Sequence, residues 1–269
     1  LNGSVELVDG EINIVDQESL QKNIQNLVRS AVLDDNENHQ YIARYLIRKI
    51  ALALGIYPSS IHDLYLARGR GEVPNSFTTP AINLRSLTIY AAQAIFKVAE
   101  EINAGAFIFE IARSETGYTD QRPSEYVANV LGAAISTGYQ GPVFIQGDHY
   151  QISAGRYKSD PESEIQALKD LTSEAIAAGF YNIDVDPSTL VDLSKPTVPE
   201  QQQLNSELTA MFSKYIRDLE PEGVTVSIGG EIGEVGEHNS TVEELRAFMD
   251  GYLEELEKIA PGTEGLSKI

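Results

Sequence analysis

Polar side chains that could do chemistry follow directly after a short apolar run at residues 143–145. Gln146, Asp148 and His149 come within four residues of that run. A carboxylate beside an imidazole can transfer a proton, or it can hold a divalent cation when further ligands are close by. A single histidine at the end of a strand is also a common structural residue that only makes a hydrogen bond. The sequence around His149 is compatible with both interpretations.

Three more apolar segments end in polar side chains, which are Asn83, Asp186 and Glu231. The carboxyl ends of parallel strands meet at one edge of a sheet, so we expect these groups to converge with His149. An imidazole with carboxylates suits zinc, but a catalytic zinc usually has three protein ligands and an open position. Either water completes a weak site, or a further ligand lies beyond Ile269.

The segment 229–238 is rich in glycine and carries three glutamates and His238. It lacks the Gly-Lys-Ser/Thr ending of a phosphate-binding P-loop, and its glutamates would repel a phosphate. Two interpretations stay open. The segment is a flexible loop, or it is a lid that brings Glu237 and His238 to the site when it closes.

The elements that position these groups begin near residue 77, where apolar segments of strand length alternate with amphipathic segments of helix length. Helix boundaries are signalled by Asp160 before a proline, by Gly179 after the apolar face, and by a capping box from Ser240 to Glu243. Such alternation predicts crossover units and a parallel sheet. The expected strands span residues 79–83, 106–111, 143–147, 180–185 and 224–228.

The fold class predicted from this pattern is α/β, a TIM (β/α)8 barrel that is incomplete at the C-terminus. Residues 76–269 form the barrel domain and hold its first five strand–helix units. Eight units typically need about 200–250 residues, and residues 266–269 resemble the start of another strand, so we expect the chain to continue past Ile269. An open sheet of five strands is the alternative.

Residues 1–75 have a different pattern and are predicted to form a helical N-terminal extension. Apolar residues recur at helical spacing over 18–31 and again over 39–54. His39 and His62 lie in this part of the chain, in polar sequence surroundings. We expect both side chains to be exposed at the surface.

The composition of the chain restricts the classes of partner that it can bind. The formal net charge is −20, from 40 acidic and 20 basic residues, which argues against nucleic acid or an anionic membrane as a partner. The chain has no cysteine, and it lacks both a membrane-length apolar run and a signal-peptide pattern. We therefore expect a cytoplasmic protein.

Three segments together resemble class II (zinc-dependent) fructose-bisphosphate or ketose-bisphosphate aldolases. These segments are residues 146–149, residues 178–186 and residues 226–233, in the order and spacing of that family. The resemblance covers roughly residues 77–259.

The resemblance implies a (β/α)8 barrel, a homodimer or higher homo-oligomer, and Zn²⁺ or another divalent metal as cofactor. The implied reaction cleaves a ketose bisphosphate, such as fructose 1,6-bisphosphate, to dihydroxyacetone phosphate and an aldehyde through a metal-stabilised enediolate. The residues that match are His149, Glu231 and Asp186 for the metal, Asp148 and Glu237 for proton transfer, and Asn83 for substrate.

The sequence departs from the family pattern at several points. Gln146 stands where the family usually has histidine, and Ala112 stands where it has serine. The two remaining histidine ligands and the phosphate-binding loops of the family belong to strands six and seven, which these residues do not include. These departures motivate an alternative function, a non-catalytic aldolase-like subunit or a sugar-phosphate-binding protein.

Overall fold

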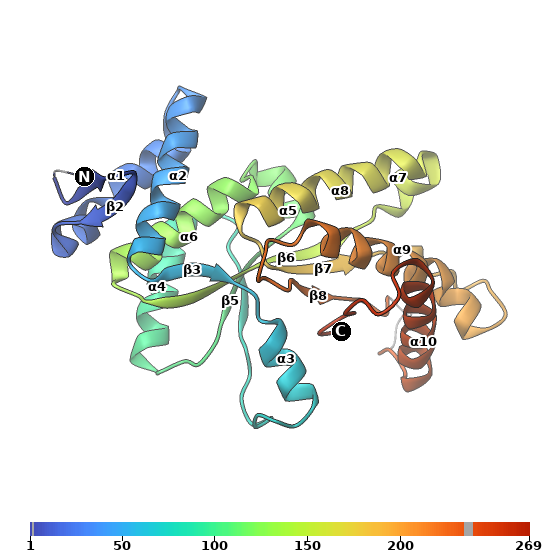
Figure 1. The fold of residues 1–269 in the computed structure, drawn as a ribbon. Coiled ribbons are helices and arrows are strands. Elements are labelled where there is room, and N and C mark those ends of the chain that lie inside the picture. The colour runs from blue at the N-terminus through green and yellow to red at the C-terminus, as the bar shows by residue number, and fades with distance from the viewer. Residues whose placement is uncertain (2, 234–238) are drawn as a thin grey trace. The chain divides into compact units, whose positions relative to one another are not determined.

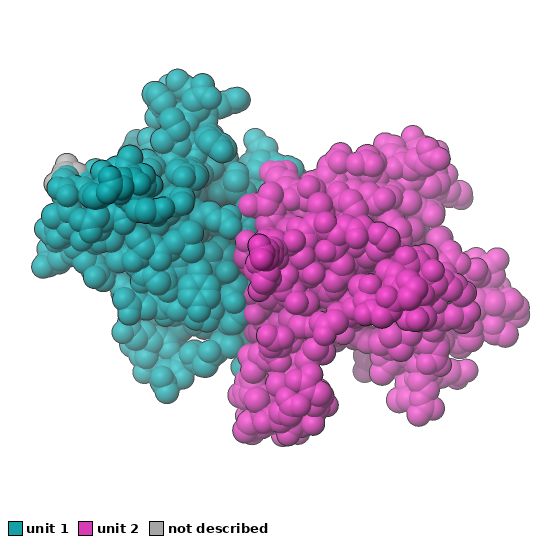
Figure 2. All heavy atoms as spheres, viewed as in Figure 1, with its two compact units in different colours: residues 1–59, 78–145, 178–180 teal, residues 60–77, 146–177, 181–269 magenta. Residues whose placement is uncertain are grey.

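The computed structural model describes residues 1, 3–233 and 239–269. The chain forms two compact units (Figure 2). Unit 1 comprises residues 1–59, 78–145 and 178–180, and unit 2 comprises residues 60–77, 146–177 and 181–269. Both units are of the α/β type with parallel strands. Within the described residues, no helix is both long enough and apolar enough to cross a lipid bilayer.

Unit 1 contains an antiparallel hairpin of β1 and β2, and two pairs of parallel strands. β4 pairs with β5. β3 pairs with the beginning of β6 (Figure 1). Its elements are β1 (Val5–Val8), β2 (Glu11–Ile14), α1 (Gln17–Leu33), α2 (Glu37–Ala53), β3 (Ile56–Ser59), β4 (Ala81–Asn83), α4 (Thr88–Glu101), β5 (Ile108–Ala112), α5 (Arg113–Thr119), α6 (Pro123–Thr137) and the first residues of β6 (Gly141–Gln151).

Helix α6 is the central helix of unit 1 and packs against α1, α2 and α4. Pro123 begins it and Gly138 ends it with φ +77°, a left-handed conformation that glycine adopts without strain. Gly132 lies in its middle, where an added Cβ would collide with Val28 Cγ2 of α1. The small residue therefore permits the close approach of the two helices.

Unit 2 contains the end of β6, which pairs in parallel with β7, and β7 pairs in parallel with β8. Helices α9 and α10 lie side by side (Figure 1), and after α10 Lys268 forms an isolated parallel bridge with Gly229. The elements of this unit are α3 (His62–Gly69), α7 (Ala154–Ser159), α8 (Pro161–Ala178), β7 (Asn182–Asp186), η1 (Ser188–Leu190), α9 (Val198–Leu219), β8 (Ser227–Gly229) and α10 (Val242–Ile259).

The α/β fold with a parallel sheet agrees with the prediction from sequence, but a closed (β/α)8 barrel is not shown. Residues 1–75 contain the expected helices and, in addition, a hairpin and strand β3. The capping box of α10 joins Thr241 to Glu244, one residue later than predicted. The prediction for His62 was wrong, because this side chain is buried, with Nε2 2.7 Å from Glu264 Oε2.

Candidate functional site

A β-bulge places Asp148 and His149 at the carboxyl end of β6. Gly147 pairs with Ile183 and Tyr150 with Val185, so two residues of β6 stand opposite one residue of β7. His149 has φ +40°, a left-handed conformation that costs about 1–3 kcal/mol in residues other than glycine. Bulges redirect side chains and are frequent next to functional sites. The strained residue His149 thus belongs to the dipeptide that the sequence singled out.

Three carboxylates surround the imidazole of His149, whose side chain is 52% exposed. Nδ1 lies 3.0 Å from Asp186 Oδ2 and 3.9 Å from Glu231 Oε1, and Nε2 lies 3.8 Å from Asp148 Oδ1. The hydrogen bond to Asp186, with the charges of all three carboxylates, raises the pKa of His149 to about 9 against the opposing effect of burial. The metal-free imidazole is therefore protonated at neutral pH.

Asp186 is the carboxylate that fixes the ring. Its Oδ2 accepts from His149 Nδ1 and from Gln151 Nε2 at 2.7 Å, and its Oδ1 accepts from the Ser188 amide at 3.1 Å and hydroxyl at 2.5 Å. Burial acts to raise the pKa of Asp186, but these hydrogen bonds outweigh it and lower the pKa. A carboxylate that holds one ring nitrogen leaves the other, Nε2, available to a ligand.

A second set of polar side chains lies two residues earlier along the same strands. Asp184 Oδ1 is 2.7 Å from Lys268 Nζ, and Asp184 Oδ2 accepts from Gln146 Nε2 at 2.9 Å. Gln146 Oε1 accepts from Lys268 Nζ. Burial raises the pKa of Asp184, and the ammonium of Lys268 counteracts this. Gln146 is thus engaged with these two residues.

The cluster carries an excess of negative charge. The carboxylates Asp148, Asp184, Asp186 and Glu231 act on one another here, and His149 and Lys268 are cationic groups placed among them. Burial raises the pKa of Glu231, and the neighbouring carboxylates raise it further. Such mutual repulsion is relieved by a cation.

The donor types of the cluster fit a divalent cation, since imidazole nitrogen and carboxylate oxygen both bind zinc. As the described side chains stand, no three histidine, aspartate or glutamate residues are arranged to hold a metal ion. His149 Nδ1 and Asp186 are bonded to each other instead. Metal binding through Nε2 therefore requires loss of a proton from the ring and adjustment of Glu231.

Asn83 lies in unit 1, at the end of β4, where its Nδ2 donates to Glu115 Oε2 at 3.0 Å. The buried Glu115 also accepts from the Ala112 amide at 2.9 Å and from Arg85 Nε. Burial acts to raise the pKa of Glu115, but these hydrogen bonds together lower it. Glu115 holds the amide of Asn83 in place.

The structure therefore brings together four of the six residues predicted from sequence, which are Asp148, His149, Asp186 and Glu231. Asn83 belongs to the other unit, and Glu237 lies outside the described residues. Sequence reasoning missed Asp184 and Lys268. Asp184 could have been found from the alternation of strand side chains, which places it on the same face as Asp186.

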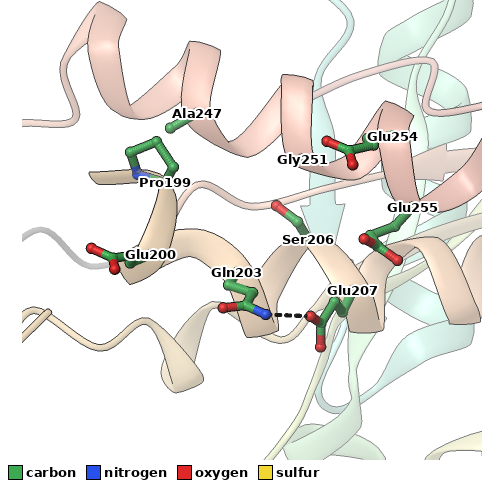
Figure 3. A pocket seen from close by; sticks show the side chains of 9 residues that line it. All are labelled: Pro199, Glu200, Gln203, Ser206, Glu207, Ala247, Gly251, Glu254 and Glu255. Atoms are coloured by element: carbon green, nitrogen blue, oxygen red, sulfur yellow. Dashed lines mark hydrogen bonds between the residues drawn. The ribbon is translucent and has the colours of Figure 1, made fainter. Parts of the chain in front are cut away.

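A groove between α9 and α10 is lined by glutamates and small residues (Figure 3). Glu200, Glu207, Glu254 and Glu255 surround it, and Gly251 lies against Ser206 where the helices approach. No residue that the sequence singled out for chemistry lines this groove, so it is separate from the cluster around His149.

No protein-family model matches the sequence, and no curated protein matches it. Among solved structures, the chain is similar to the crystal structure of a probable tagatose 6 phosphate kinase from Sinorhizobium meliloti 1021, with a TM-score of 0.47 and 17% identity. The match covers 66% of this chain and 45% of that chain. The chain thus spans less than half the length of that protein, and a likeness this weak supports no argument about function.

Proposed function

We propose that the chain is a class II aldolase-like, metal-dependent lyase that cleaves a ketose bisphosphate, such as fructose 1,6-bisphosphate, to dihydroxyacetone phosphate and an aldehyde. The observation that supports this best is the cluster of Asp148, His149, Asp186 and Glu231 at the ends of parallel strands, with its surplus of negative charge. The proposal includes a complete (β/α)8 barrel and a homo-oligomer.

The residues that would hold Zn²⁺ or another divalent cation are His149, through Nε2, and Glu231. A cation bound there would act as a Lewis acid toward the carbonyl oxygen of the ketose. The hydrogen bonds of Asp186 suit a role in orienting the ring of His149 better than direct ligation, because both of its oxygens already accept from described donors.

Asp148 is proposed to be the general base that accepts the proton of the C4 hydroxyl. It sits on the bulge with a side chain that is 17% exposed, as a base that must be reached by substrate requires. Asp148 takes the proton of the C4 hydroxyl as the C3–C4 bond breaks, the C4 carbon becomes the aldehyde, and the bonding electrons remain on the dihydroxyacetone phosphate half. Glu237 stays the predicted donor of the proton that C3 then receives, and Asn83 the predicted substrate contact.

A second candidate function is a non-catalytic aldolase-like subunit or a sugar-phosphate-binding protein. The position of Gln146 favours it, because this side chain, which stands where the family usually has histidine, is bound to Asp184 and Lys268.

The test combines metal content with a coupled assay for triose phosphate. Asp148→Asn should retain the metal and lose cleavage by about 10²–10⁴-fold, since it removes a general base. Asp250→Asn, at an exposed aspartate of α10, is the matched control and should behave as the unmodified chain. Metal binding without cleavage of any ketose bisphosphate would favour the second candidate, whereas loss of metal in Asp148→Asn would overturn the assigned role.

A further inference from the structure

We propose that the exposed face of α2 is the contact surface between two copies of this chain. The two α2 helices pack against each other in antiparallel orientation, across a two-fold axis at Tyr45. The inference rests on the proposed function only through its homo-oligomer, whose contact surface it specifies. It does not depend on the proposed reaction, because no residue of α2 belongs to the cluster around His149.

Helix α2 carries apolar side chains on two opposite sides. The buried side consists of Ala43, Ile47, Ile50 and Ala51, and the helix packs on α1 and α6. The opposite side is called the α2 face below. It recurs at intervals of three or four residues, which places its members on one side of a helix, and it consists of Asn38, Tyr41, Ile42, Tyr45, Lys49 and Leu52.

The apolar side chains of the α2 face are largely open to solvent. Tyr41 is 72% exposed, Ile42 and Tyr45 are each 52% exposed, and Leu52 is 48% exposed. Single exposed apolar residues are normal on a soluble protein, but several together on one helix face mark a binding surface. Tyrosine is also enriched in the surfaces through which proteins bind one another.

The charges of the chain favour a second copy as the occupant of this face. Each copy has a formal net charge of −20, so two copies repel each other wherever their carboxylates meet. The α2 face contains no carboxylate, and Lys49 is its only side chain that is charged at neutral pH. The Nζ atom of Lys49 lies 5.9 Å from the centroid of the Tyr45 ring. Two copies can therefore meet through this face without opposing carboxylates.

The α2 face is also symmetric about Tyr45, the middle residue of this 17-residue helix. Tyr41 and Lys49 stand at equal distances before and after Tyr45, and so do Asn38 and Leu52. Across a two-fold axis between antiparallel helices, residues at equal distances come level with each other. An axis at Tyr45 therefore brings the ammonium of Lys49 level with the Tyr41 ring of the second copy. A cation–π contact can form there, and it forms twice in the dimer.

Disulfide cross-linking tests the position of the axis. The chain has no cysteine, so a single introduced thiol can only pair with its own copy. Tyr45→Cys should give a covalent dimer on mild oxidation, because a disulfide requires Cα atoms within about 7 Å and only positions next to the axis meet this condition. Leu253→Cys is the matched control, at a residue of α10 that is 51% exposed, and should not cross-link.

Analytical ultracentrifugation measures the association itself. The unmodified chain should form a dimer at micromolar concentration. Tyr45→Asp places two carboxylates opposite each other and should raise the dissociation constant at least about 30-fold, whereas Leu253→Asp should leave it unchanged. If Tyr45→Asp does not fold, as judged by circular dichroism, Tyr41→Ala takes its place and should weaken the dimer about tenfold, because it removes the ring that faces Lys49.

Three results would overturn the inference. These are an unmodified chain that is monomeric up to about 100 μM, a dimer that the substitutions on the α2 face do not weaken, and cross-linking no faster at Tyr45→Cys than at Leu253→Cys. None of them affects the metal content or the triose phosphate assay, which test the proposed reaction. A chain that dimerises through α2 but cleaves no ketose bisphosphate would support the inference and overturn only that reaction.

Discussion

Replacing Gly229 with alanine should separate Lys268 from Asp184 and destabilise unit 2. The added methyl group would collide with Asp184 Oδ1, and it would lie 3.0 Å from Asp184 Cγ and 2.8 Å from Lys268 Cε. Contacts this short between heavy atoms force one of the neighbours to move. Because Lys268 Nζ lies 2.7 Å from Asp184 Oδ1, a shift of either side chain should lengthen and weaken this ion pair.

The magnitude follows from the cost of an uncompensated buried charge. Breaking a buried ion pair costs about 3–5 kcal/mol, and the residual exposure of both side chains places the expected value near the lower end. A loss of about 3 kcal/mol raises the equilibrium constant for opening about 150-fold. Asp184 can limit the loss by taking up a proton, because its pKa is already raised.

Native-state hydrogen exchange is the appropriate assay, because two compact units need not unfold together. In Gly229→Ala, the backbone amides of β7 and β8 should exchange about 150-fold faster than in the unmodified chain. The matched control is Gly155→Ala in α7. An added Cβ meets nothing within 4 Å at this position, so the substitution should stabilise the protein slightly. Protection within about 0.5 kcal/mol of the unmodified chain would refute the reasoning about this glycine.

Three further predictions concern the other polar side chains. In the metal-free protein, an NMR titration should show the ring of His149 losing its proton at a pKa of about 9; the stability that this charge contributes is fully present below about pH 6.5 and disappears as the pH rises through 9. Asp186→Asn removes the largest cause of that shift, so the midpoint should fall toward 6.5, and an unchanged midpoint would contradict the assigned hydrogen bond. Glu115→Ala should destabilise unit 1 by about 1–3 kcal/mol, measured by exchange of β4 and β5 amides, because Asn83 and the Ala112 amide lose their acceptor.

Several parts of the fold could be predicted from sequence because they depend on local chemistry. Helix α8 begins at Pro161 and ends before Gly179, which has φ +112°, a conformation that glycine adopts readily. Asp186 ends an apolar strand, and Glu231 follows another soon after its end. Both therefore belong to the edge where parallel strands present their polar side chains.

The bulge at Asp148 and His149 could not be predicted in the same way. Strand alternation would place these neighbours on opposite faces. With the register shift against β7, Asp148 Oδ1 lies 3.8 Å from His149 Nε2, while His149 Nδ1 bonds to Asp186. Register depends on the pairing of distant segments, which leaves no signal within the strand itself.

Long-range contacts were missed for the same reason. Lys268 meets Gln146 across 122 positions of sequence, and His62 meets Glu264 across 202. Neither contact could be predicted, because each depends on tertiary packing. His62 was expected at the surface because polar residues such as Ser60 and Asp63 lie near it in sequence. Its side chain is instead buried, and its Nε2 lies 2.7 Å from Glu264 Oε2 in the segment that follows α10.

The central claim is that the cluster around His149 binds one divalent cation. A calorimetric titration of Zn²⁺ into the metal-free protein tests it most directly. We predict about one ion per chain, as expected for a catalytic zinc site, and a loss of affinity of at least about tenfold in both His149→Ala and Glu231→Gln. Absence of stoichiometric binding, or binding that neither substitution weakens, would contradict the claim.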